Sequence, residues 1–208
     1  EQIDFAMSGR SSALIELWSR MYEEKAPWLH NTDNANIPAT IAGEIARLTT
    51  LELQSKVEGS PRAECMDAVY QQVLGKLRVQ TEYAFAKGSM VFKPYITPDG
   101  TIAVQYIQAD MFFPLDFDSE KMTRCAFLDQ FRKGNEIYSR IELYSLSGDV
   151  LSIKNHVFIA RTEGILGTEV PIGTVPRWAE LAEEMQFSGI QKLPIGYFTV
   201  PLGNNRDS

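Results

Sequence analysis

Four aspartates come nearest to a catalytic pattern in this 208-residue chain, and they are Asp110, Asp116, Asp118 and Asp129. Clustered carboxylates hold the metal ions of two-metal nucleases and supply the acid and base of glycosidases. Asp116 and Asp118, however, flank Phe117 in a segment typical of acids at the exit of a strand, where they bond the nearby backbone. The structural interpretation is favoured. A metal-dependent phosphodiesterase that uses Asp110, Asp116 and Asp118 stays open as an alternative function.

The histidines and cysteines make a weaker case for a metal site. The chain has two of each, and no pair has the close spacing that places two zinc ligands in one turn or on one helix face. A zinc site would need all four across the sequence: His30, Cys65, Cys125 and His156. Lone histidines and cysteines are more often surface or core groups. We therefore expect no metal and no other cofactor, and two reduced cysteines with no disulfide.

Catalytic sequence motifs are missing from the chain. It has no Gly-x-Ser-x-Gly nucleophile elbow, no phosphate-binding Gly-x4-Gly-Lys-Ser/Thr loop and no dinucleotide fingerprint. These absences argue against most acyl-transfer enzymes and most nucleotide-dependent enzymes. We expect a protein that is not an enzyme.

The charge balance disfavours a module that grips nucleic acid by its phosphates. Lysine and arginine number 20 against 27 aspartates and glutamates, which gives a net charge of -7. Glutamates are interleaved with the basic residues of the first third, as on a mixed solvated surface; those basic residues are Lys25, Arg47, Arg62, Lys76, Lys87 and Lys93. No apolar run approaches the roughly 18 residues of a membrane helix, and the chain starts with acidic residues, unlike a signal peptide. We expect a soluble protein made in a reducing cytoplasm, with no membrane partner.

Three amphipathic helices are predicted in the first third, over about residues 11–27, 38–59 and 60–88. Each begins at a capping serine or a first-turn proline and ends at proline or glycine. On the second helix one face carries Ile41, Ile45 and Leu48. On the third the apolar stripe contains Met66, Val69, Tyr70, Val73, Leu74 and Leu77. We expect this third helix to be the scaffold on which the sheet packs.

After Gly88 the apolar period changes from 3.6 to 2, which predicts strands. The runs 90–96 and 101–107, joined by Thr97-Pro98-Asp99-Gly100, indicate a hairpin. The runs 123–131, 136–146 and 150–160 indicate an antiparallel meander. In the middle run one face has Ile137, Ile141 and Leu143, and the other, expected to be solvated or covered by a partner, has Tyr138, Arg140, Glu142 and Tyr144. A short helix around Trp178, Leu181 and Met185 and a last strand at 195–200 complete the prediction.

Helices first and antiparallel strands second predict an α+β fold, in which N-terminal amphipathic helices pack on an antiparallel β-sheet. Neither an internal repeat nor a flexible linker divides the chain. We expect a single domain over residues 1–208, with a helical part at about 11–88 and an antiparallel β part at about 89–202.

Short segments spread along the chain carry a family resemblance. They are Glu16-Leu17-Trp18 running to Lys25-Ala26-Pro27-Trp28, Ile37-Pro38-Ala39 with Ile41-Ala42 and Glu44-Ile45-Ala46-Arg47-Leu48, Gly59-Ser60-Pro61-Arg62-Ala63, Phe92-Lys93-Pro94-Tyr95, Gln108-Ala109-Asp110 with Phe112-Phe113-Pro114, and Gly196-Tyr197-Phe198 with Val200-Pro201-Leu202. In this order and spacing the chain resembles the portal proteins of tailed double-stranded DNA bacteriophages, especially those of phages that infect Gram-positive bacteria.

The resemblance implies a structural subunit of the ring, usually of twelve copies, at one vertex of the capsid. Such a ring is the conduit for DNA packaging and ejection and joins head to tail. The partners implied are other copies of the chain, the major capsid or scaffold protein, the packaging terminase, the head–tail connector and double-stranded DNA that passes without sequence-specific binding. The implied location is the virion, with synthesis in the host bacterial cytoplasm. A head–tail adaptor protein is a further alternative.

The resemblance is to the wing of a portal, so the stem, clip and crown regions are expected to be absent from the chain. Much of the contact near the ring axis comes from those regions in portals. We therefore expect this piece to be a monomer or weak oligomer at micromolar concentration. Exposed aromatics would mark the neighbour-facing surface, and the candidates are Trp28 and Trp178.

Overall fold

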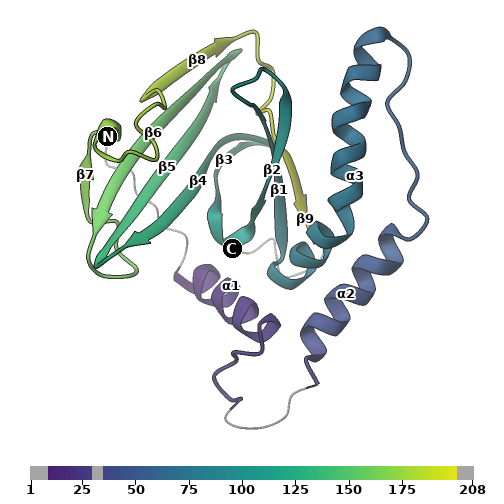
Figure 1. Ribbon diagram of the computed structural model, residues 1–208, viewed down its shortest axis with the longest axis horizontal. Helices are drawn as coiled ribbons and strands as arrows, with labels where there is room; N and C mark the ends of the chain where they lie inside the picture. The colour runs from purple at the N-terminus through teal and green to yellow at the C-terminus, as the bar shows by residue number, and fades with distance from the viewer. Residues whose placement is uncertain (1–8, 30–34, 201–208) are drawn as a thin grey trace. The chain divides into compact units, whose positions relative to one another are not determined.

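The computed structural model describes residues 9–29 and 35–200 and has an α+β fold, as predicted (Figure 1). Its described residues form two compact units. Of the described residues, 9–29, 35–110 and 195–200 belong to the first unit, and the second unit is Met111–Pro194. These units cut across the expected helical and β parts, because the first hairpin and the last strand belong with the helices. The extent of the domain as a whole stays a prediction.

The first unit contains three helices: α1 (Gly9–Tyr22), α2 (Ile37–Thr50) and α3 (Pro61–Lys87). The ends of α3 are the ones that the sequence predicts. The Ser60 hydroxyl accepts a hydrogen bond from the Ala63 amide at 3.1 Å, Pro61 occupies the first turn, and Gly88 closes the helix at a positive φ of 92°. Local capping chemistry is therefore sufficient to define this 27-residue helix.

The second helix is shorter than predicted, because it ends at Thr50 and not near Gly59. An extended segment follows and is held along α3 by side chains of that helix. The Asp67 carboxylate accepts a hydrogen bond from the Val57 amide at 2.8 Å, and the Gln71 amide donates to the Ser55 carbonyl at 2.9 Å. These bonds satisfy the backbone outside a helix, and this explains why the chain stops winding before the glycine.

A three-stranded sheet completes the first unit, in the order β2-β1-β9. Its strands are β1 (Ser89–Ile96), β2 (Ile102–Gln108) and β9 (Gly196–Thr199). The predicted hairpin and the predicted last strand are thus confirmed, and all pairings are antiparallel. Both β1 and β2 contact α3, so this helix does support a sheet. Its predicted apolar stripe does not form the contact as expected, because none of the six stripe residues is buried and Leu74 and Leu77 lie beside the end of α2.

The second unit is an antiparallel sheet in the order β3-β4-β5-β6-β7, with β8 also paired to β6 (Figure 1). Its strands are β3 (Phe112–Asp118), β4 (Lys121–Lys133), β5 (Glu136–Ser147), β6 (Val150–Ala160), β7 (Thr168–Val170) and β8 (Glu184–Ser188). The predicted meander is confirmed as β4-β5-β6.

The predicted short helix around Trp178 is wrong. The segment forms a single 3-10 turn at Ile172–Thr174, further turns, and then β8, which contains Met185. Asn155 on β6 holds this segment in place. Its backbone N–H donates a hydrogen bond to the Glu183 carbonyl, and its side-chain amide donates one to the Ala182 carbonyl, both at 2.8 Å. The apolar spacing at residues 172, 175 and 178 suits a 3-10 turn as well as an α-helix.

The second face of β5 is not solvated. The 171–182 segment covers one end of it, and the Trp178 ring lies 5.9 Å from the Arg140 guanidinium and packs against Tyr138. At the other end Tyr144 is buried with its ring 5.2 Å from that of Phe127. The sequence predicts that solvent or a partner contacts this face, whereas other residues of the same chain cover it.

Alkaline pH is expected to test the burial of Tyr144. Burial, helped by the nearby Glu142 carboxylate, raises the pKa of the phenol well above its ordinary value of 10.0. The neutral phenol therefore stabilises the fold below pH 10, and this contribution is lost as the pH rises further, because the unfolded tyrosine ionises first. In denaturant melts between about pH 9 and 11, Tyr144→Phe should flatten the fall in stability. The exposed control Tyr95→Phe should leave it unchanged; equal slopes for both variants would contradict the prediction.

Candidate interaction surface on the helices

The helix α2 packs on α3 through its small residues. Ala42 and Ala46 are buried, and Gly43 faces the Glu82 side chain of α3. The large aliphatic residues point the other way, since Ile37, Ile41 and Leu48 are 54–60% exposed. An amphipathic helix usually buries its large apolar residues in its own domain. This one presents them to the exterior, which is typical of a surface that meets another protein.

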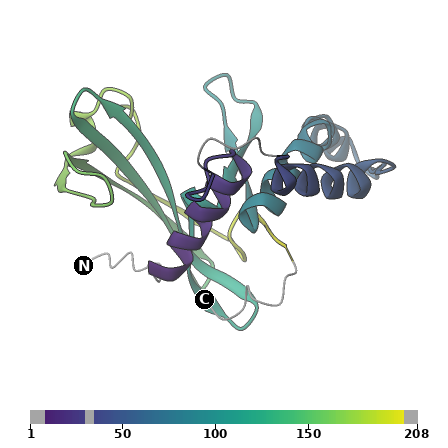
Figure 2. The same ribbon diagram turned by 90° about the horizontal axis from the view of Figure 1, so that it is seen from below.

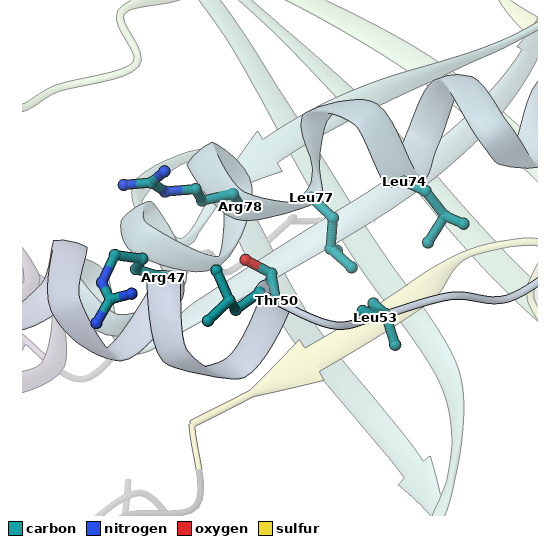
Figure 3. Close-up of a pocket in the computed structure, with 7 residues that line it drawn as sticks. Arg47, Thr50, Leu53, Leu74, Leu77 and Arg78 are labelled. Atoms are coloured by element: carbon teal, nitrogen blue, oxygen red, sulfur yellow. The ribbon is translucent and has the colours of Figure 1, made fainter.

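A groove lies beside this helix, between the end of α2 and α3. It encloses about 250 Å³ and is lined by Arg47, Thr50, Leu51, Leu53, Leu74, Leu77 and Arg78. Leu53, Leu74 and Leu77 gather at one end, and Arg47 and Arg78 lie past Thr50 at the other (Figure 3). We call these lining residues the helical groove. It combines an apolar floor with a rim of positive charge.

The charges at the rim are arranged around one glutamate. Arg47 donates two hydrogen bonds to the Glu44 carboxylate, at 2.7 and 2.8 Å. These bonds hold the pKa of Glu44 below its ordinary value, and the charge of Arg78 acts in the same direction. Arg78 is exposed and forms no ion pair with another described residue. The rim therefore offers a positive charge that is available to a partner.

The structure does not bring the candidate aspartates together. Asp110 lies in the first unit and binds the Lys87 ammonium at 2.9 Å, whereas the other three lie in the second unit. Asp116 and Asp118 are exposed on β3. Asp129 lies on β4, where it accepts a hydrogen bond from the Trp178 indole at 3.0 Å and pairs with Arg177 at 3.3 Å. Across residues 9–29 and 35–200, no three His, Cys, Asp or Glu side chains form a group that could hold a metal ion.

The histidines and cysteines are also dispersed. Cys65 is exposed on α3 in the first unit, and Cys125 is buried on β4 in the second, with no disulfide to either. His156 lies on β6, with its Nδ1 atom 2.7 Å from the Glu169 carboxylate. Cys125 is in register with Tyr144, and His156 with Ile141, so these two residues lie on opposite faces of the sheet. His30 lies outside the described residues.

The two candidate tryptophans have opposite environments. Trp28 is 59% exposed. Such exposure is expected of an interface residue when the subunit is not assembled. Trp178 is only 2% exposed, and the expectation that it is an exposed aromatic is wrong. Its ring packs in a core cluster with Val157, Ile172 and Val175. The sequence pattern of residues 172–178 could not predict this burial, because Val157 belongs to a distant strand. Whether Trp28 contacts a neighbour stays a prediction.

The basic residues of the helical unit are mixed with acids, as predicted. Lys25 pairs with Glu23 at 2.9 Å, Arg47 with Glu44 and Lys87 with Asp110. Lys76 lies 5.5 Å from the centre of the Tyr106 ring. These interactions do not favour a role for the four basic side chains in binding phosphate groups.

Sequence reasoning missed the helical groove. Its signal was present in α2, where small residues recur at 39, 42, 43 and 46 on one side and large ones at 37, 41 and 48 on another. A helix with two such sides can pack closely on one neighbour and still offer an apolar face to a second. Only the packing on α3 shows which side is already occupied.

Within residues 9–29 and 35–200, every helix is too short or too polar to span a bilayer. Comparison with known protein families finds none that matches this chain, and comparison with curated proteins finds no significant match.

Proposed function

We propose that this chain is the wing-containing part of a bacteriophage portal protein, a structural ring subunit and not an enzyme. The observation that carries the proposal is the aliphatic face of α2, which is exposed although Ala42 and Ala46 on the other side of the helix are buried. The sequence resemblance to portal proteins and the α+β fold are consistent with it. In this role the chain acts by assembling, and its location is the capsid vertex of the virion.

A ring requires that two different surfaces of each subunit meet, because only a heterologous contact closes around a rotation axis. Such contacts usually bury a large area with an apolar centre. The aliphatic face of α2 and the helical groove would be one of the two surfaces. The net charge of -7 suits a conduit, because DNA that must slide gains nothing from basic walls.

The partners of the ring follow from the same proposal. They are the neighbouring copies, the capsid or scaffold protein, the packaging terminase, the head–tail connector and the DNA that moves through the channel. A head–tail adaptor would share the fold but would bind a completed portal instead of the capsid and terminase. Co-purification with the capsid protein and the terminase therefore supports the portal, and co-purification with a portal ring alone supports the adaptor.

The exposed face of α2 gives a direct test of assembly. The double variant Ile41→Ser with Leu48→Ser should change the free energy of unfolding of the isolated chain by less than about 0.5 kcal/mol, because both side chains are largely exposed. In the complete gene product the same variant should reduce the ring, measured by light scattering coupled to gel filtration, to subunits and small oligomers. Ile165→Ser, at an exposed loop position of the second unit, is the matched control and should leave the ring intact.

Two outcomes would count against the proposal. If the wild-type complete protein forms no ring, the chain is not a portal subunit. If the melting midpoint rises with the logarithm of free magnesium or manganese, a carboxylate metal site exists, and the phosphodiesterase alternative is favoured instead.

A further inference from the structure

The turn of the β1–β2 hairpin is held by an unusually dense set of hydrogen bonds. The Thr97 amide donates to the Thr101 carbonyl, and the Gly100 amide to the Thr97 carbonyl, both at 2.9 Å. The Asp99 carboxylate accepts from the Thr97 and Thr101 hydroxyls. Pro98 and Gly100, the latter at a φ of 80°, suit the turn geometry. The loop is therefore ordered before any partner binds, which lowers the entropy cost of binding.

This ordered turn carries an exposed apolar pair. Ile96 is 75% exposed, and its register partner Ile102 and the adjacent Tyr95 are also exposed. These three side chains form an exposed apolar group beside the polar turn. In both views the turn lies apart from α2, so the hairpin does not cover the aliphatic side of that helix (Figures 1 and 2).

The helical groove complements this tip in size and in charge. An apolar cavity of about 150 Å³ holds a benzene molecule, so a groove of about 250 Å³ accommodates the side chain of an isoleucine. The tip carries the negative charge of Asp99, and the rim of the groove carries Arg47 and Arg78. The tip thus presents an apolar side chain beside an acid, and the groove presents leucines beside two arginines, so the two surfaces are complementary.

We propose that the β1–β2 turn of one subunit inserts into the helical groove of the next, with Ile96 on the leucines and Asp99 beside Arg78. The occupant is a second copy of this chain, because tip and groove are two different surfaces of one subunit, as a heterologous ring contact requires. This inference rests on the proposed function and specifies its contact. Opposite charges at the rim set the register of the two copies.

Site-specific disulfide cross-linking tests the contact in the assembled complete gene product. One preparation carries Ile96→Cys and the other, with a size tag, Leu53→Cys, both with Cys65→Ser. Because each variant has one exposed engineered thiol, a product of mixed size can form only between copies. Disulfides require Cβ atoms about 3.5–4.5 Å apart, so mild oxidation of mixed rings should give a strong mixed product. Ile165→Cys in place of Ile96→Cys is the matched control and should give little.

A charge exchange gives a second readout that does not depend on thiols. Arg78→Glu should weaken assembly several-fold, and so should Asp99→Lys, whereas the two together should recover most of the loss. Asp99→Asn, which keeps an acceptor for the threonine hydroxyls, shows whether a changed turn alone explains the effect.

The outcomes separate this inference from the proposed function. Rings that form without the mixed product, and without recovery by the charge exchange, would show that the portal proposal stands while the contact lies elsewhere. A complete protein that stays monomeric would overturn both. The mixed product together with recovery supports the contact.

Discussion

Replacing Trp178 with alanine is expected to lower the free energy of unfolding of the second unit by about 3–5 kcal/mol. The side chain is 2% exposed and belongs to the core cluster with Val157, Ile172 and Val175. Its ring lies 5.2 Å from that of Phe131 in an edge-on arrangement. Removal of the ring leaves a cavity among Val157, Ile172 and Val175, which are held in place and can fill it only in part.

Urea melts followed by far-ultraviolet circular dichroism measure the loss. Trp178→Phe separates packing from hydrogen bonding, since it keeps an aromatic ring and removes the indole donor to Asp129; we expect it to cost about 1–2 kcal/mol. The exposed Trp28 provides the matched control, and Trp28→Ala should cost less than about 0.5 kcal/mol. Equal losses for the two alanine variants would show that Trp178 is not a core residue.

Replacing Arg140 with methionine is the second change with a large expected effect, about 3–5 kcal/mol of stability. The Arg140 side chain is 16% exposed and lies 3.6 Å from the Glu142 carboxylate, which is 10% exposed, and 3.9 Å from that of Asp129. It also donates a hydrogen bond to the Asn155 amide oxygen at 3.0 Å. The substitution keeps the apolar volume but removes the positive charge that compensates a buried carboxylate.

The double variant Arg140→Met with Glu142→Leu distinguishes a charge effect from a packing effect. Asp129 keeps Arg177 and the Trp178 indole as partners, whereas Glu142 is the more buried of the two carboxylates and lies nearer to Arg140. Arg140 Nε is buried with no hydrogen-bond partner, and its removal relieves that cost. We expect the double variant to recover more than half of the loss in urea melts. A double variant as unstable as Arg140→Met would mean that side-chain shape, and not charge, matters at this position.

The sequence predicts those elements whose ends are decided by neighbouring residues. Ser60, Pro61 and Gly88 define α3, and Thr97 to Gly100 define the first hairpin, because caps and turns are satisfied within a few residues. The alternation along residues 136–146 identifies β5 for a similar reason. Local signals of this kind do not depend on the rest of the chain.

Only the tertiary structure decides which surfaces are covered. The 171–182 segment has an apolar spacing compatible with a helix, yet Asn155 on β6 binds its backbone and Trp178 fills the core. In α2 the sequence shows both a small side and a large side, and packing on α3 through Ala42 and Ala46 leaves the large side exposed. The aspartates look clustered in sequence, but among the described residues they form no group with other acidic, histidine or cysteine side chains that could hold a metal ion. Burial and clustering depend on contacts between residues far apart in the chain. The candidate interaction surface therefore cannot be predicted from the sequence, because it depends on how α2 packs on α3.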